Sequence, residues 1–306
     1  MIVIGESIQI ISRQVKAAIA SRDKARIQEL ALNQVENGAH WLDLNIGPQK
    51  KAGAEVMTWI VNAVQEVTDA PLSLDTTNTE AMEAGLEACH KAALINSTDA
   101  TPERLNALVP LAAKYNVNII ALTLGSGGLP GTTDARLGLV LEQILPAAAQ
   151  HNVPFDHLFL DPLVLTVNGN QEQATQTIEA IRYFKQICEP PPMTTCGLSN
   201  ISSGVPPEIR PLINRVFLTM MLGAGLDSAI MNPLDSELRE TLRIIDSGDK
   251  STPKAMLYLD LYNAYAAGEQ FDTSTINWAD PELRDIGRTI QVQQNELLYA
   301  HGYLST

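Results

Sequence analysis

Short apolar runs alternate with longer amphipathic stretches along most of the chain. The apolar runs predict strands at Ile2–Ile4, Trp41–Ile46, Leu72–Leu74, Ala92–Ile95, Val117–Leu124, Leu158–Leu160, Met193–Leu198 and Ser228–Met231. Between them, apolar residues recur at steps of three and four residues, which predicts helices at 12–37, 52–67, 79–89, 102–115, 133–150, 171–187, 208–225 and 234–246. Because each apolar strand is followed by a helix, we expect a parallel sheet covered on its faces.

The number of strand–helix units predicts the fold. Eight such units within about 250 residues match a closed (β/α)₈ barrel, the TIM barrel. An open doubly wound α/β sheet is the alternative arrangement of the same units. We therefore divide the chain into a barrel domain at 1–250 and a C-terminal helical extension at 251–306.

The extension differs from the rest of the chain in its aromatic content. It holds five of the seven tyrosines and predicts two helices, at 253–267 and 281–300, joined by a polar loop around Phe271–Trp278. An aromatic stripe on a helix usually packs against a core or a subunit interface. We expect the extension to pack on the barrel, and a role in oligomerisation or in covering the barrel mouth is the functional alternative.

Charge and composition exclude several functions. The chain has 21 basic and 35 acidic side chains and a formal net charge of -14, so it lacks the cations that nucleic acid or an acidic membrane surface requires. Hydrophobic residues make up 45% and charged residues 18%, typical of a packed globular enzyme. No apolar run approaches the roughly 20 residues of a membrane span, and the first residues do not resemble a signal peptide. We expect a cytoplasmic protein.

The cysteines do not predict a metal site or disulfides. Cys89, Cys188 and Cys196 are an odd number at wide spacing, which fits a reducing compartment. No pair has the C-x₂₋₄-C spacing of a zinc site, and only His90 adjoins a cysteine. We expect no directly bound metal.

Polar side chains follow nearly every predicted strand. They are Glu6, Asp43, Asn45, Asp75, Asn96, Asp161, Ser199 and Asn200. Since a (β/α)₈ barrel builds its active site from the carboxyl ends of its strands, these groups should converge on one mouth. Individually, Asp75 and Asn96 could instead cap the following helices, and Asp161-Pro162 could be a turn.

A pterin suits this set of side chains. One carboxylate can accept both the 2-amino group and the N3–H of the ring, and asparagine amides can both donate to and accept from its other polar atoms. The glycine-rich segment Gly125–Gly131 lacks the spacing of a dinucleotide or Walker phosphate loop. We expect it to be a flexible barrel loop that could act as a lid.

Seven segments resemble, in order, the methyltetrahydrofolate:corrinoid-protein methyltransferases of the pterin-binding superfamily. They are IGES (4–7), LDLNIG (42–47), LSLDTTN (72–78), LINST (94–98), LDPLVL (160–165), GLSNIS (197–202) and RPLINRVFL (210–218). The resemblance spans about residues 1–245 and implies a (β/α)₈ barrel, usually a homodimer. It also implies transfer of a methyl group between N5 of tetrahydrofolate and the cobalt of a corrinoid carried by a partner protein.

The resemblance also implies roles for individual residues. Asp75, Asn96 and Asp161 would hold the pterin ring, and Asn200 would lie beside N5. Gly197 and Ser199 would line the same wall, with Arg210 on the following loop; Glu6 and Asn45 complete the predicted substrate site. We expect Asn200, Asp75 and Asp161 to be the catalytic residues. The sequence departs from the family at Ser7-Ile8-Gln9 and in a longer 203–209 segment.

Several functions remain open at this level. No corrinoid-binding module is visible, so the corrinoid should arrive on a separate protein. The altered first loop and the extension favour formation of methyltetrahydrofolate in a catabolic demethylation system, with methyl donation to a corrinoid iron–sulfur protein in the acetyl-CoA pathway as the alternative. Dihydropteroate synthase, which resembles this chain in its pterin site, is less favoured because its basic residues are missing after strands seven and eight. A non-catalytic pterin-binding subunit is the alternative from another class.

Overall fold

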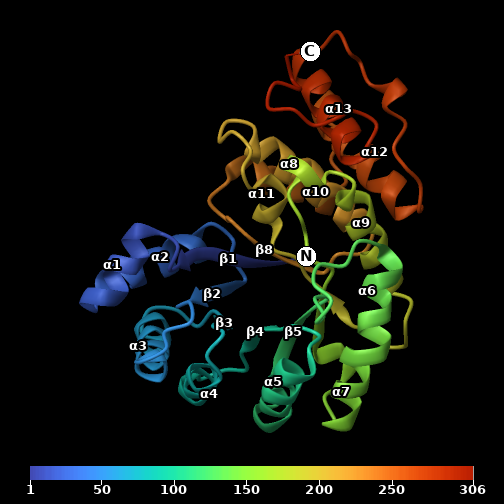
Figure 1. Cartoon of the computed structure of the whole chain (residues 1–306). Helices are drawn as coiled ribbons and strands as arrows, with labels where there is room; N and C mark the ends of the chain where they lie inside the picture. The colour runs from blue at the N-terminus through green and yellow to red at the C-terminus, as the bar shows by residue number, and fades with distance from the viewer. Residues whose placement is uncertain (306) are drawn as a thin grey trace.

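The computed structural model describes residues 1–305, and its eight strands form one parallel sheet rolled into a barrel (Figure 1). The strands are β1 Ile2–Gln9, β2 Trp41–Asn45, β3 Leu72–Asp75, β4 Leu94–Thr98, β5 Asn118–Leu122, β6 Leu158–Asp161, β7 Met193–Thr194 and β8 Ser228–Met231. Consecutive strands pair from β1 to β7, and β1 also pairs with β8. This sequential order confirms the predicted barrel and excludes the doubly wound sheet, in which the strand order reverses.

The barrel closes between β7 and β8, which share few backbone hydrogen bonds. The Ile230 N–H donates to the Cys196 carbonyl at 2.8 Å, and Gly197 and Ile230 form a single bridge. Asp227 strengthens this seam because its carboxylate accepts the Thr194 N–H at 2.7 Å and the Thr194 hydroxyl at 2.9 Å. The predicted strand at 193–198 is thus too long: β7 ends at Thr194, and a 3₁₀ turn, η3 (Leu198–Ser202), follows.

Helices surround the sheet. They are α1 Arg13–Ser21, α2 Lys24–Glu36, α3 Gly53–Gln65, α4 Thr79–Ala88, α5 Pro102–Tyr115, α6 Thr133–Leu139, α7 Leu145–Gln150, α8 Val167–Asn170, α9 Gln173–Phe184, α10 Arg210–Gly223, α11 Ser236–Ser247, α12 Pro253–Ala266 and α13 Pro281–Gln293. A π-helical segment, η1 (Val140–Ile144), joins α6 to α7, and short 3₁₀ turns lie at η2 Phe155–His157 and η4 Thr273–Thr275. None of the described helices is long and apolar enough to cross a bilayer.

Two of the predicted helices have different bounds in the structure. The stretch 12–37 is two helices, because Arg22 adopts a left-handed conformation (φ 56°) and Asp23 then caps α2 by accepting from the Arg26 N–H. The last helix ends at Gln293 rather than at residue 300, and Asn295 has a positive φ of 63°. Apolar spacing continues across both breaks, so the pattern alone conceals them.

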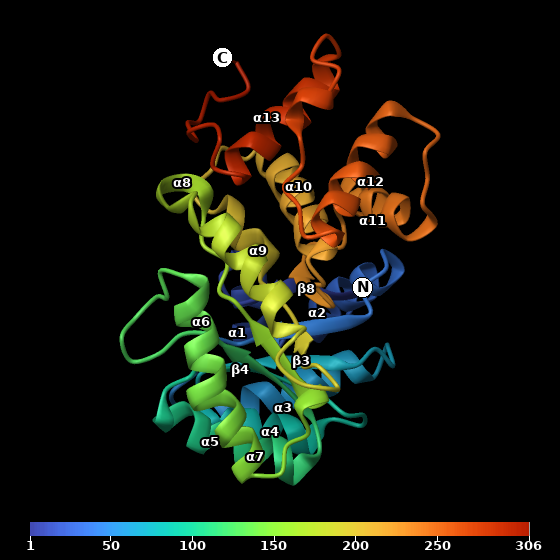
Figure 2. The same ribbon diagram turned by 90° about the vertical axis from the view of Figure 1, so that its right-hand side faces the viewer.

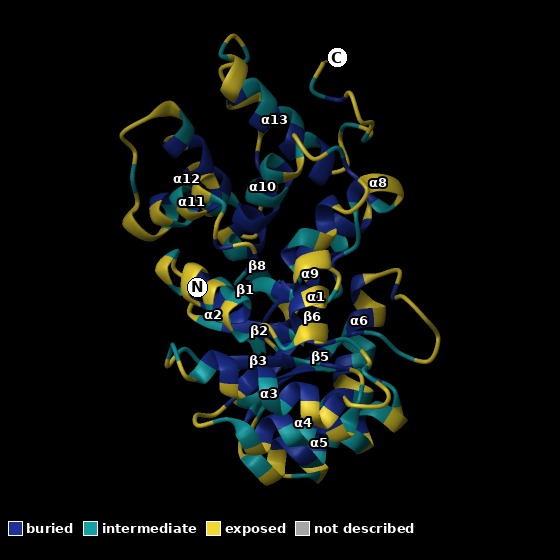
Figure 3. Cartoon of the chain, turned by 90° about the vertical axis from the view of Figure 1, so that its left-hand side faces the viewer, coloured by how far each residue is buried: buried dark blue, intermediate teal, exposed yellow. Residues whose placement is uncertain are grey.

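The extension packs against the outside of the barrel, over α10 (Figure 3). Tyr258, Tyr265 and Tyr303 are buried in a hydrophobic cluster shared with α9, α10 and α11, which confirms the predicted packing of the aromatic stripe. Gly223 of α10 lets the Tyr262 backbone of α12 approach, since a Cβ at Gly223 would lie 2.5 Å from that carbonyl oxygen. A separate domain boundary at residue 250 stays a prediction.

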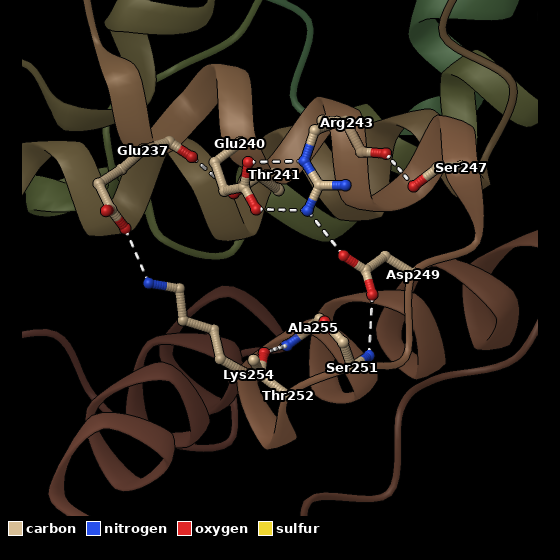
Figure 4. A network of polar contacts seen from close by, with 10 residues as sticks. All are labelled: Glu237, Glu240, Thr241, Arg243, Ser247, Asp249, Ser251, Thr252, Lys254 and Ala255. Atoms are coloured by element: carbon tan, nitrogen blue, oxygen red, sulfur yellow. Dashed lines mark hydrogen bonds and ion pairs between the residues drawn. The ribbon is translucent and has the colours of Figure 1, made fainter.

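A polar network joins α11 to α12 (Figure 4). Arg243 of α11 pairs with Glu240 and with Asp249, which lies in the connecting loop, and both distances are 2.6 Å. Lys254, at the start of α12, donates to Glu237 at 2.8 Å. These largely exposed pairs orient the junction more than they stabilise it, because surface ion pairs contribute little free energy.

Candidate active site

The polar ends of β2, β3 and β4 meet at the barrel mouth. Asn45, Asp75 and Asn96 lie side by side in register across these strands. The Asn45 amide donates to the Asp75 carboxylate. Deeper in the barrel, Asp43 accepts from the Ser73 hydroxyl at 2.6 Å and from the Asn96 amide at 2.9 Å. The structure thus brings together three of the predicted site residues around a fourth polar group.

Asp43 was predicted to lie at the barrel mouth, but it was not among the residues expected to bind substrate. It is buried and links β2 to both β3 and β4 through its carboxylate. The signal was present in the sequence: Asp43 and Asn45 are two residues apart on one strand and therefore share a face. Its role is to hold the Asn96 amide, which leaves the Asn96 carbonyl oxygen for other partners.

The alternative that these polar residues are helix caps is wrong for Asp75 and Asn96. Asn78 caps α4 by accepting from the Ala81 N–H, and Thr101 caps α5 by accepting from the Arg104 N–H. Asp75 and Asn96 are thus not needed to satisfy the first N–H groups of these helices.

Burial raises the pKa values of the carboxyls at the mouth. Removal from water raises the pKa values of Asp43 and Asp75, and the Asp43 charge raises that of Asp75 further. Among residues 1–305, the Asn45 amide is the one side-chain donor to Asp75, and its hydrogen bond opposes the rise in pKa. A ligand that donates N–H groups would stabilise the ionised form, since a carboxylate accepts two such bonds well.

Asp161 ends β6 on the other side of the mouth. Its carboxylate accepts the Leu163 N–H at 2.8 Å, which confirms the turn after Asp161-Pro162. Burial raises the pKa of Asp161 to about 7, although the Leu163 N–H and the nearby Arg136 guanidinium oppose the rise. Arg136, from α6, is a second residue that the predicted set omitted.

The wall after β7 carries Ser199 and Asn200. The Ser199 hydroxyl donates to Glu6 of β1 at 2.7 Å, which joins the first and seventh strands across the seam. Burial raises the pKa of Glu6. Asn200 is exposed on η3, and its side chain forms no hydrogen bond within residues 1–305. Gly197 makes room for it, since a Cβ there would lie 3.1 Å from the Asn200 amide nitrogen.

The remaining predicted elements lie at the rim. Arg210 is exposed at the start of α10, and its Nε donates to the Val205 carbonyl at 2.6 Å, so it fixes the 203–209 loop. Within the glycine-rich segment, Gly125 and Gly128 form a tight turn with Gly128 at φ 90°. Leu129 at its tip is 59% exposed. Figure 2 shows α8, the loop before α6 and the chain after α13 on one side of the molecule.

The metal and cysteine predictions can be examined in the same region. Across residues 1–305, no three His, Cys, Asp or Glu side chains gather in a way that could hold a metal ion. The three cysteines are free and apart, and burial raises the pKa of Cys89 to about 12. The mouth therefore offers carboxylates, amides and a hydroxyl as its chemistry.

Comparison with known proteins identifies the family of the chain. The family model described as "Pterin binding enzyme" matches residues 12–232. The chain is 30% identical over 249 residues to a methylcorrinoid:tetrahydrofolate methyltransferase of Eubacterium limosum, covering 81% of this chain and 90% of that protein. It is 31% identical over 230 residues to methionine synthase of Mycobacterium tuberculosis, covering 72% of this chain and 19% of that protein.

Solved structures show the same fold. Dihydropteroate synthase of Thermus thermophilus superposes with a TM-score of 0.56 at 21% identity, over 72% of this chain and 88% of that one. The Yersinia pestis enzyme gives a TM-score of 0.59 at 17% identity, over 81% and 94%. The family model and the full-length relative together establish that the chain is an enzyme of the pterin-binding family.

Proposed function

We propose that this enzyme transfers a methyl group between the cobalt of a separate methylcorrinoid protein and N5 of tetrahydrofolate. The observation that carries the proposal is the combination at one mouth of buried carboxyls with the free amide of Asn200. The Eubacterium limosum relative is named for this pair of substrates. Because its name puts methylcorrinoid first, we propose formation of methyltetrahydrofolate in a catabolic demethylation system, with the acetyl-CoA pathway direction as the alternative.

The carboxyls would bind the pterin ring. Asp75 and Asp161 can each accept N–H donors, and the amide of Asn96, held by Asp43, presents its carbonyl oxygen. Ionisation of Asp75 and Asp161 would accompany binding, since N–H donors favour the charged form of a carboxyl. This contact would orient the ring so that N5 lies at the β7 wall.

Asn200 would serve the reacting nitrogen. N5 attacks the methyl carbon with its lone pair, the electron pair of the cobalt–carbon bond remains with cobalt, and N5 then loses its proton to solvent. The corrinoid of the partner supplies the methyl group as the electrophile. An asparagine amide can donate or accept during these steps without fixing the charge of N5, while Asp75 and Asp161 supply a negative potential that tolerates a cationic N5.

The first experiment is binding followed by transfer. Calorimetry should detect binding of methyltetrahydrofolate to the protein. The change in visible absorbance of free methylcobalamin should then report methyl transfer to tetrahydrofolate. Asn200→Ala should lower the single-turnover rate by about 10²–10³, the usual effect of one positioned polar group. Asn33→Ala, on the exposed face of α2, is the matched control and should keep the full rate.

The outcomes separate the alternatives. Full activity in Asn200→Ala would remove the role assigned to Asn200. Binding of folate without any transfer would favour the non-catalytic pterin-binding subunit. Absence of folate binding would refute both. The homodimer and the cytoplasmic location are part of the same proposal, and light scattering tests the first directly.

A further inference from the structure

Arg136 is a buried cation beneath the active-site mouth. It lies on α6 with no exposed surface, in line with Val140 and Ile144 along one buried helix face. A charged side chain on such a face requires compensation, because an isolated buried charge costs several kcal/mol. The contacts of Arg136 show where that compensation comes from.

The guanidinium joins three mouth segments. Its Nε donates to the Pro162 carbonyl at 2.6 Å, in the turn that follows Asp161. Its Nη2 donates to the Gln173 side chain at 3.1 Å, and Gln173 in turn donates to the Gly131 carbonyl at 3.1 Å. Arg136 therefore connects the turn after β6, the start of α9 and the end of the glycine-rich loop.

Asp161 is the carboxyl that this cation faces. The bond from Arg136 to the Pro162 carbonyl places the guanidinium next to Asp161 in the chain, and its positive charge opposes the rise in the Asp161 pKa that burial causes. Cys196, after β7, is buried, and burial together with the charge of Asp161 raises its pKa. On α9, Glu179 accepts from the Thr133 hydroxyl at 3.3 Å at the start of α6. Arg136 thus places a buried positive charge beside the turn that carries Asp161.

We propose that Arg136 is a positioning residue of the pterin site, whose buried positive charge lies against the Asp161 turn and whose hydrogen bonds hold that turn in place. The ligand contact of Asp161 rests on the proposed function, whereas the pairing of Arg136 with Asp161 does not. Burial pushes Asp161 towards the protonated form at neutral pH, and a protonated carboxyl loses one of its acceptor sites. Arg136 would therefore set the pH above which the site binds a ligand rich in N–H donors.

The direct test is titration of Asp161 in the ligand-free protein. Carboxyl ¹³C NMR, with the Asp161 signal assigned from Asp161→Asn, gives its midpoint in the wild type, Arg136→Gln and Arg136→Lys. Arg136→Gln should raise the midpoint by about one pH unit or more, because a close opposite charge lowers a carboxyl pKa by 1–3. Arg136→Lys keeps the charge and should remain near the wild type. Equal midpoints in the wild type and Arg136→Gln would overturn the proposal.

A second readout separates this role from a structural one. Calorimetry with methyltetrahydrofolate should show Arg136→Gln binding about threefold more weakly than the wild type near pH 7.5 for a one-unit rise, with the deficit disappearing above pH 9. A loss of affinity that is the same at every pH would mean that Arg136 only supports the loop, and would overturn the assigned role. If Arg136→Gln does not fold, Arg136→Lys serves as the test. An Asp161 titration midpoint in Arg136→Lys that differs from that of the wild type would overturn the role assigned to Arg136. If the wild type binds no folate, the proposed function fails while the titration still decides the role of Arg136.

Discussion

Replacement of Asp75 by asparagine tests whether the mouth is destabilised by its own carboxyls. The substitution keeps the size of the side chain and an oxygen that can accept from Asn45, but it removes one buried negative charge. No cation of residues 1–305 forms an ion pair with Asp75, and the charge of Asp43 opposes its ionisation. We therefore expect Asp75→Asn to stabilise the ligand-free protein at pH 8.

The magnitude follows from the raised pKa of Asp75. Between the ordinary value near 4 and the higher value in the folded state, the native protein binds a proton that the unfolded chain does not, so stability falls as pH rises. Each pKa unit corresponds to about 1.4 kcal/mol, so a folded-state pKa of about 8 for Asp75 gives a cost on the order of 5 kcal/mol at pH 8. The increase in stability from Asp75→Asn should be smaller at pH 5, because the wild type loses less stability between pH 4 and pH 5 than between pH 4 and pH 8.

Urea unfolding followed by circular dichroism at pH 5 and pH 8 measures both values. Asp69→Asn is the matched control: the Asp69 side chain is 96% exposed, and its replacement should change stability by less than about 0.5 kcal/mol. The same Asp75→Asn protein should bind methyltetrahydrofolate about 10- to 100-fold more weakly, because hydrogen bonds to a charged acceptor contribute about 1.5–3 kcal/mol. Destabilisation at pH 8, or a gain that does not depend on pH, would refute the reasoning.

Two further predictions concern the scaffold. Gly223→Ala should destabilise by about 1–3 kcal/mol in thermal unfolding, since the added Cβ meets the Tyr262 carbonyl between α10 and α12; Gly138→Ala, with open space around it, should not destabilise. Asp227→Ala should lower the free energy of unfolding in urea by about 2–3 kcal/mol, because the Thr194 donors at the barrel seam lose a charged acceptor. An unchanged urea midpoint would show that the seam does not depend on Asp227.

The barrel could be predicted from the sequence because its signal is repetitive. Each β/α unit buries an apolar strand beneath an amphipathic helix, and the eight repeats agree with one another. The breaks at Arg22 and after Thr194 could not be predicted in this way. At Arg22 the helix ends by a change of backbone conformation that leaves the apolar spacing intact. After Thr194 the closing hydrogen bonds depend on Asp227, which lies in a different part of the chain.

The candidate site was predictable only in part, for a related reason. Asp75, Asn96 and Asp161 could be predicted because they lie at the ends of strands, and in a barrel these ends meet at one mouth. Pairs formed across the barrel have no such local signal. The bond between Ser199 and Glu6 joins residues 193 positions apart, and Arg136 looks like an ordinary charged residue of a helix until its exposure is known.

The distribution of charge within the mouth also indicates how the proposed pterin binding is compatible with a net charge of -14. Four carboxyls, from Glu6, Asp43, Asp75 and Asp161, lie at the mouth, and burial raises the pKa of each. A neutral heterocycle rich in N–H donors would stabilise their ionised forms on binding. The unfavourable burial of these groups in the empty site would then be relieved by the ligand, which increases its affinity. An anionic ligand would be repelled by the ionised carboxyls, because in the described part of the chain Arg136 is the one buried cation near them, beside Asp161. The same carboxyls that destabilise the empty site therefore select for a ligand that donates hydrogen bonds.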